Sequence, residues 1–429
     1  MHNDSFSISI VLCTRHQTLH RLFTMRVLLP LVLATTSAKS FQDTLVNCTQ
    51  QVLSQPTARS AVTVLGRWAV FATEDHMDGN HSGLVDIFDA QSGAWSTSQM
   101  SHSRTNMCAT SWGPLAIFAG GSDGRGLPKS RNVDVWDSRT GAWSLHALAM
   151  GRDLLACASA GGVTLFAGGS APQVNQSETA SVEVWDHTDD SWRVLPQGLS
   201  QPRKKPEAVA VGERIVISGG EIAKAVALGR YTPGPPPPPP PLGSYTGTMD
   251  VFEAKTSTWE SLNISLPTPM QYFGAARASG RATPGAADGV AVFAGGFYND
   301  IRLGATHLYD PLSRRFVGGP LLAHNRSNLH AASVGAGGRY AAFGAGNIDA
   351  TAKVTLDFYD GDSGEWAHSH THTPIVGNGV ASAGNVALFA GFDGRIDAIA
   401  LDGDCSMIPG GRAAAAAPAA AAASATLVN

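Results

Sequence analysis

Residues 133–143 read Val-Asp-Val-Trp-Asp-Ser-Arg-Thr-Gly-Ala-Trp, and this passage decides the fold because the chain repeats it. Related passages end at Trp95 and Trp192, so the closing tryptophans at 95, 143 and 192 are separated by 48 and 49 residues. A fixed period of this size is typical of a repeat architecture, in which each unit buries its apolar face only against its neighbours.

Each unit reads as four strands, most clearly in the unit that follows Arg104. Its second strand, residues 115–119, is apolar throughout and ends in a glycine pair. Its third strand, 132–136, alternates polar and apolar residues, as a strand with two different faces does. The turn 137–141 supplies an Asp and a Gly, which suit a tight turn before the outer strand.

Seven such units can be counted, and the seventh stops before its outer strand. Residues 51–59 resemble the end of unit three, residues 197–203. We therefore predict an all-β, seven-bladed β-propeller of four-stranded blades. Its last blade would be closed by a strand from residues 45–55 pairing with residues 396–400, which removes two exposed sheet edges.

The repeat resembles the kelch repeat in its order of Arg, apolar strand, Gly-Gly, acidic-Val-aromatic-Asp strand and Gly-Ala-Trp, over residues 42–408. The resemblance implies a propeller of six or seven blades. A WD40 propeller is the rival, but Trp136-Asp137 lies in the third strand and follows the glycine pair. Some kelch propellers are copper-radical oxidases, so a metal-dependent enzyme with its site in the channel is the alternative function.

Composition narrows the class of partner. The chain has 429 residues, a net charge of −4, 43% apolar and 15% charged residues, and 47 glycines. This mixture suits strands and tight turns. The acidic balance without a basic run disfavours nucleic acid, and no apolar run approaches the roughly 20 residues that span a bilayer. We expect a monomer.

The first 40 residues read as a targeting segment. Met25-Arg26 precedes an apolar stretch at 27–34 and small residues at 36–38, which together resemble a secretory signal starting at Met25. Secretion or a secretory-pathway lumen is the favoured location, and a cytoplasmic or organellar one the alternative. The propeller would then occupy 41–408, with a proline-rich loop insertion at 231–245 and an Ala-rich disordered tail at 409–429.

Five arginines recur just before the first, innermost strand of their units, with Gln271 and Asn378 near that place in units five and seven. Equivalent positions lie on one rim, so these arginines predict a basic mouth that binds a protein or peptide, acidic in character. The other interpretation is that each Arg packs on its own blade. The five are Arg59, Arg104, Arg152, Arg203 and Arg326.

Four of the cysteines carry predictions. Counting along the repeats places Cys48 and Cys405 at the same turn, where the ring closes, and predicts a disulfide between them. Cys108 and Cys157 fall in neighbouring innermost strands among small apolar residues, and we predict free buried thiols there.

The remaining patterns predict little chemistry. His368, His370 and His372 alternate on one strand face, which fits a solvated strand better than a metal site. We predict no cofactor, no metal and a non-catalytic binding module for protein or glycan partners. Five sequons mark candidate glycosylation sites at Asn47, Asn80, Asn175, Asn263 and Asn325.

Overall fold

The computed structural model describes residues 40–56, 59–75, 83–122, 128–171, 178–222, 245–280, 288–298, 301–344, 346, 355–371, 377–391, 393–406 and 408. They belong to a compact unit that begins at Lys39. The predicted targeting segment up to residue 39, most of the proline-rich insertion and the tail from 409 lie outside the described residues.

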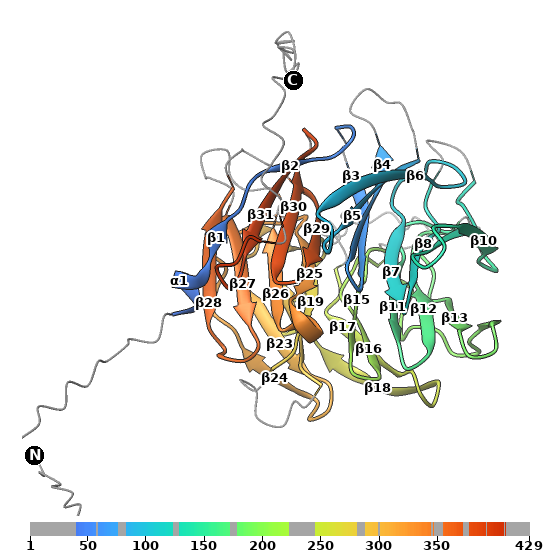
Figure 1. Cartoon of the computed structure of the whole chain (residues 1–429). Coiled ribbons are helices and arrows are strands. Elements are labelled where there is room, and N and C mark those ends of the chain that lie inside the picture. The colour runs from blue at the N-terminus through green and yellow to red at the C-terminus, as the bar shows by residue number, and fades with distance from the viewer. Residues whose placement is uncertain are drawn as a thin grey trace, which may run out of the picture. The chain divides into compact units, whose positions relative to one another are not determined.

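Seven antiparallel sheets stand around a common axis, which confirms the predicted seven-bladed propeller (Figure 1). Strands of blades one to four are β3 (Arg59–Leu65), β4 (Trp68–Asp75), β5 (Leu84–Asp89), β6 (Ala94–Gln99); β7 (Cys108–Trp112), β8 (Leu115–Ala119), β9 (Asn132–Asp137), β10 (Trp143–Ala147); β11 (Ala156–Ala160), β12 (Val163–Ala167), β13 (Val182–Asp186), β14 (Ser191–Val194); β15 (Glu207–Val211), β16 (Arg214–Ser218), β17 (Thr248–Glu253), β18 (Thr258–Ser265).

The first strand of each blade is innermost. It contacts the first strand of the next blade, and β29 contacts β3, so the ring is closed. Strands of blades five to seven are β19 (Gly274–Ala278), β20 (Val290–Ala294), β23 (Thr306–Asp310), β24 (Arg315–Gly318), with the hairpin β21 (Phe297–Tyr298) and β22 (Ile301–Arg302); β25 (His330–Val334), β26 (Tyr340–Gly344), β27 (Thr355–Asp360), β28 (Trp366–His370); β29 (Gly377–Ala383), β30 (Val386–Gly391), β31 (Arg395–Ala400), β1 (Val46–Asn47), β2 (Gln51–Val52).

The N-terminal strands complete the last blade, as predicted. β1 pairs with β31 through Val46 opposite Ala400, and β2 pairs with β31 through Gln51 opposite Ile396. Figure 1 shows these two strands lying beside β31. The strand breaks between them, at the turn that contains Cys48.

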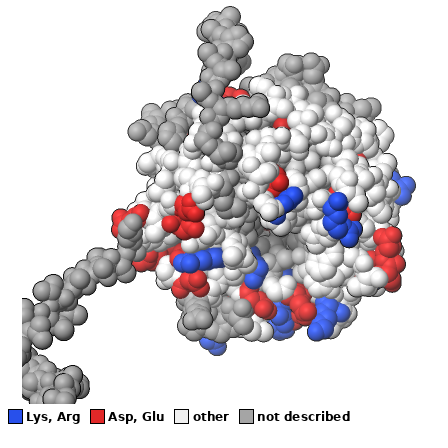
Figure 2. All heavy atoms as spheres, viewed as in Figure 1, with Lys and Arg blue, Asp and Glu red and all other residues white. Residues whose placement is uncertain are grey.

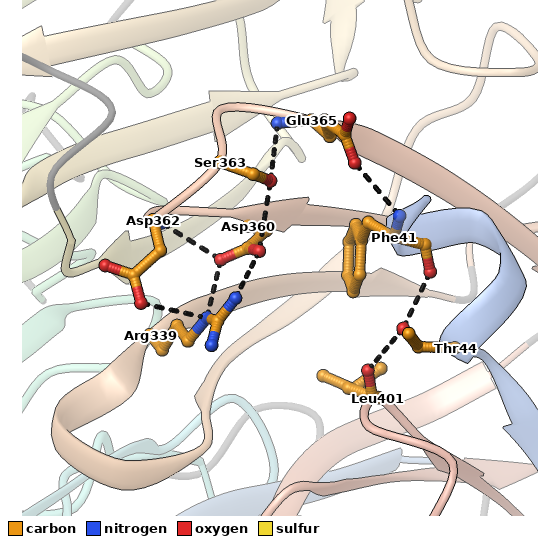
Figure 3. A network of polar contacts seen from close by, with 8 residues as sticks. All are labelled: Phe41, Thr44, Arg339, Asp360, Asp362, Ser363, Glu365 and Leu401. Carbon is orange, nitrogen blue, oxygen red and sulfur yellow. Dashed lines mark hydrogen bonds and ion pairs between the residues drawn. The ribbon is translucent and has the colours of Figure 1, made fainter. Parts of the chain in front are cut away.

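A short helix, α1 (Phe41–Thr44), fixes the chain ahead of these strands (Figure 3). The Phe41 amide donates to Glu365 of blade six at 2.9 Å, and the Phe41 ring stacks on Tyr340 with centroids 5.3 Å apart. The Thr44 hydroxyl donates to the Leu401 carbonyl at 2.8 Å. The helix therefore ties blade six to blade seven. The second helix, η1 (Ala336–Gly338), is a single 3-10 turn.

The glycine pairs that end the second strands join neighbouring blades. Gly121 has a φ of +103° and donates its amide to the Arg152 carbonyl of the next blade at 2.9 Å. A Cβ on Gly120 would lie 2.4 Å from the same carbonyl oxygen. Glycine is needed because both the dihedral angle and the close approach exclude a side chain.

Candidate binding site at the channel mouth

Four of the repeated arginines are buried within the blades, where each forms an ion pair. Arg104, Arg152, Arg203 and Arg326 are all 0% exposed. Each pairs with the acidic residue of its own third strand: Arg104 with Asp134 at 2.7 Å, Arg152 with Glu183 at 2.9 Å, Arg203 with Asp250 at 2.6 Å, and Arg326 with Asp357. The prediction of an exposed basic mouth is therefore wrong for these four residues.

Each acid also holds the loop that enters its blade. Asp134 accepts the Ser101 amide at 2.8 Å, and Asp250 accepts the Ser200 amide at 3.3 Å, three residues before the arginine in both cases. Burial lowers the pKa of Arg203, and Asp250 opposes this shift. The arginines are needed inside, because a buried carboxylate requires a partner.

Blades one and five depart from this pattern. In blade five the set is replaced together: Pro267, without an amide hydrogen, stands at the loop position, Met270 stands for the arginine, and His307 stands for the acid. Met270, not Gln271, is thus the equivalent residue, since its carbonyl accepts the Gly220 amide.

The register of blade one shows that the prediction for Arg59 is also wrong. Ser54 donates its amide to Asp86 as Ser101 does to Asp134, and three residues on from Ser54 is position 57. Arg59 is two residues further, inside β3 and opposite Asp75. It is therefore not the equivalent of Arg104.

Five residues with a left-handed backbone conformation follow the buried arginines at the channel mouth, and we call them the collar. Two residues after each arginine, or after Met270, the chain takes a φ between +54° and +58°. Such a backbone costs a non-glycine residue about 1 kcal/mol or more. None of the five collar residues is glycine: they are Asn106, Leu154, Lys205, Tyr272 and Asn328.

Hydrogen bonds run around the collar from blade to blade. The Lys205 amide donates to the Leu154 carbonyl at 2.8 Å, and the Leu154 amide donates to the Asn106 carbonyl at 3.0 Å. The Asn106 amide in turn donates to Glu74 of blade one at 3.1 Å. The collar backbone is thereby fixed, and its five side chains are all partly exposed.

Charged side chains of alternating sign surround the collar on blades two to four. Lys129 pairs with Asp153 at 2.5 Å. Lys204 lies between Glu178 at 3.1 Å and Glu221 at 3.2 Å. Burial works against the charge of Lys204, but its hydrogen bonds to the two glutamates and their charges raise its pKa.

Aromatic side chains complete the mouth on blades four and five. The Lys205 ammonium lies 4.1 Å from the ring centre of Tyr272 and 3.4 Å from Glu221. Tyr245 packs edge-on against Phe297 and Tyr298, with centroids 6.4 and 6.1 Å apart. We call this set the mouth cluster: Lys129, Asp153, Glu178, Lys204, Lys205, Glu221, Tyr245, Tyr272, Phe297 and Tyr298.

The surface carries no broad field of one sign on the face seen in Figure 2, where acidic and basic side chains lie among one another. The mouth cluster follows the same rule, with three cations beside three anions. Sequence reasoning missed this cluster because its members come from loops whose spacing varies between blades.

Two disulfides bear on the cysteine predictions. Cys48 and Cys405 are bonded, with Cα atoms 5.5 Å apart, which confirms the predicted link at the ring closure. Cys108 and Cys157 are also bonded, with Cα atoms 5.8 Å apart, so the prediction of free thiols is wrong. Cys157 lies one register position deeper than Cys108, and this offset turns the two side chains toward each other.

The other predicted sites are only partly described. His368 is hydrogen-bonded to Asp357 at 2.6 Å, while His372 lies outside the described residues. Within the described ranges, no three His, Cys, Asp or Glu side chains gather closely enough to hold a metal ion. Of the sequon asparagines, Asn47 and Asn325 are exposed, and Asn80 and Asn175 are not described. No described helix has the length and hydropathy of a membrane span.

These features define the protein as a seven-bladed β-propeller with a mixed charged and aromatic channel mouth. Its fold is similar to the solved structure of YjhT, with a TM-score of 0.53 and 10% identity, over 74% of this chain and 99% of that one. No protein-family model and no curated protein matches the sequence. The likeness shows the fold, and the kelch assignment stays a resemblance.

Proposed function

We propose that this protein is a non-catalytic binding module that holds a protein or glycan partner at the channel mouth. The observation that carries the proposal is the collar. A left-handed backbone favours glycine, yet Leu154, Lys205 and Tyr272 are kept there. The collar presents these partly exposed side chains together at one rim on a backbone fixed by hydrogen bonds, which places them to meet a partner.

The mouth cluster gives such a partner complementary contacts. Half-buried rings offer apolar area with little conformational freedom to lose. The alternating charges on Lys204, Glu178 and Glu221 select the register and orientation of the partner more than its overall charge. With the arginines buried, acidity of the partner is no longer the expected basis of recognition.

Secretion or a secretory-pathway lumen is the location we propose. The Cys48–Cys405 and Cys108–Cys157 bonds require an oxidising compartment. The signal-like segment after Met25 supports the same location, as does the exposure of the sequon residues Asn47 and Asn325.

A collar-glycine variant, Leu154→Gly with Lys205→Gly and Tyr272→Gly, tests the proposal. Glycine relieves the backbone strain while freeing the unfolded chain by about 0.5–1 kcal/mol per residue, so stability should change little. Wild type and variant are used to capture partners from the native extracellular fluid, with quantitative mass spectrometry as the readout.

We expect one partner to be enriched on the wild type and lost from the collar-glycine variant. Glu213→Gln with Lys255→Gln, at the opposite end of blade four, is the matched control and should retain it. A large loss of stability in the variant would assign the collar a structural role, and a retained partner would place binding elsewhere. Either result contradicts the proposal.

A further inference from the structure

A groove lies between blades two and three, at the end of the blades opposite the collar. It has a volume of about 310 Å³ and is bounded by the β9–β10 turn of blade two and the β13–β14 turn of blade three. The Ser138 amide donates to the Pro114 carbonyl at 2.9 Å and so fixes the β9–β10 turn to the first hairpin of its blade. The volume is at the small end of the range of sites that hold small molecules.

The floor of the groove is apolar. Leu115 and Val135 of blade two line it beside the indole of Trp185 from blade three, which is 4% exposed. His146 on the outer strand β10 is partly exposed and packs its ring on that indole, with centroids 4.8 Å apart. The floor is therefore a fixed surface that offers aliphatic and aromatic contact area to a ligand.

Polar groups stand around this floor. Asp190 accepts the Trp185 indole N–H at 2.8 Å through Oδ1, and its other oxygen has no partner among the described residues. The Thr140 hydroxyl accepts a backbone amide of its own turn at 3.2 Å, so its hydrogen is left to donate. The Ser144 hydroxyl shares a hydrogen bond with His146 Nε2 at 3.3 Å. The rim thus holds both acceptors and donors in defined places.

The two residues that shape the groove differ from their counterparts in the neighbouring blades. The outer-strand position of His146 is taken by Leu195 in blade three and by Ile264 in blade four, and both pack into the apolar clusters of their blades. The turn position of Asp190, two residues before the aromatic residue of the outer strand, is Gly141 in blade two. The groove is therefore a property of this blade interface and not of the repeat.

The lining suits a neutral ligand that carries hydroxyl groups. Asp137, the second carboxylate of the groove, is paired with Arg139 at 2.6 Å, so little negative charge is left to attract a cation. A pyranose ring presents C–H groups on its faces and hydroxyl groups at its edge. Its face covers the apolar floor, while one hydroxyl donates to Asp190 and another accepts from Thr140.

We propose that this groove is a binding site for one neutral sugar ring. Asp190 and Thr140 bind its hydroxyl groups, and His146 and Trp185 contact its C–H face. The site lies at the other end of the blades from the collar and does not depend on the function proposed for the channel mouth. A free sugar and a residue of a glycan chain share this chemistry, so the test includes probes of both kinds.

Calorimetry on the full chain tests the site with the methyl glycosides of glucose, galactose and mannose. Asp190→Gly copies Gly141, and His146→Leu copies Leu195, so each variant carries a residue that a neighbouring blade accommodates. Arg314→Gly makes the same change at the corresponding turn of blade five and is the matched control. We expect at least one glycoside to bind the wild type and the control saturably, and at least tenfold more weakly to both groove variants.

Disaccharides of the sugar that binds distinguish the two sources. Tighter binding of a disaccharide than of the methyl glycoside assigns the site to a glycan chain, and equal binding assigns it to a free sugar. Absence of binding by all three glycosides overturns the proposal, as does unchanged affinity in both groove variants. Neither result bears on partner capture at the collar, because the collar residues are intact in every variant.

NMR of the indole N–H groups provides a second measurement that needs no groove variant. The Trp185 signal, assigned by its loss in Trp185→Phe, should shift on addition of the bound glycoside because its acceptor Asp190 gains a second hydrogen bond. Tetramethylammonium is the cationic probe and should leave the signal in place. A shift with tetramethylammonium and none with the glycosides would make the groove a cation site and overturn the proposal.

Discussion

Arg203 and Asp250 approach within 2.6 Å, and neither side chain is exposed to solvent. The same pair is built into four blades, where it joins the entering loop, the first strand and the third strand. Blade five shows that the pair is one unit, because the loop amide, the cation and the acid are all replaced there at once. The arginines therefore stabilise the blades from within and are not free to contact a partner.

Breaking one member of this pair should be severe. Arg203→Met leaves the Asp250 carboxylate buried and unpaired, and we expect a loss of about 3–5 kcal/mol in the free energy of unfolding, measured by urea denaturation. The double variant Arg203→Met with Asp250→His copies blade five and should lose clearly less. Arg139→Met breaks an exposed pair with Asp137 and should show no measurable change. Equal losses in the single and double variants would contradict the idea of one unit.

The glycine pairs should tolerate no side chain. Gly120→Ala places a Cβ 2.4 Å from the Arg152 carbonyl and must force the neighbouring blades apart. We expect a loss of about 2–4 kcal/mol, from backbone strain and steric conflict together. Gly141→Ala is the control, since its φ is also positive but nothing lies within 4 Å of the added Cβ. It should lose only about 1 kcal/mol, and thermal melting of both variants compares them directly.

The two disulfides should differ in their contribution to stability. Chain-entropy arguments give about 6 kcal/mol for the Cys48–Cys405 bond, which spans 357 residues, and about 4 kcal/mol for Cys108–Cys157, which spans 49. The pairwise serine variants, compared by denaturation under non-reducing conditions, should rank in this order. Peptide mapping that finds either pair as free thiols in protein from its native compartment would contradict the predicted contribution of that bond.

His368 should make stability depend on pH. Its hydrogen bond to Asp357 raises the pKa of His368, against the effect of burial. A raised folded pKa gives a contribution that is complete below the ordinary value of about 6.5 and is lost as pH rises through the folded value. The wild type should therefore lose stability between pH 6 and 8 by more than His368→Gln does, in urea titrations at each pH. Parallel curves would exclude this contribution.

The sequence predicted those features of the fold that follow from the repeat period. Steps of 48 and 49 residues revealed the blades, and counting along them placed Cys48 beside Cys405. The prediction failed where a shift of one residue in strand register decides which way a side chain points. Cys108 and Cys157 follow their arginines by four and five residues, and this odd offset, read as incidental, is what makes them face each other. The collar could not be foreseen, because no glycine marks its left-handed turns.

Glu207 supplies a second pH dependence, of the same sign as that of His368 but over a wider range. Its folded pKa of about 8 lies above the ordinary 4.5, so between these values the native state retains a proton that the unfolded chain releases. Stability therefore falls as pH rises through this window, by about 1.4 kcal/mol per pH unit from this group alone.

Glu207→Gln keeps the shape of the side chain and removes its titration. We expect the variant to match the wild type near pH 4.5 and to exceed it in stability at pH 8 and above, measured by urea denaturation across the range. The control Glu213→Gln, whose carboxylate is exposed, should follow the wild type throughout. A Glu207→Gln curve that runs parallel to the wild type would show that this carboxyl group ionises as freely in the folded protein as it does in water.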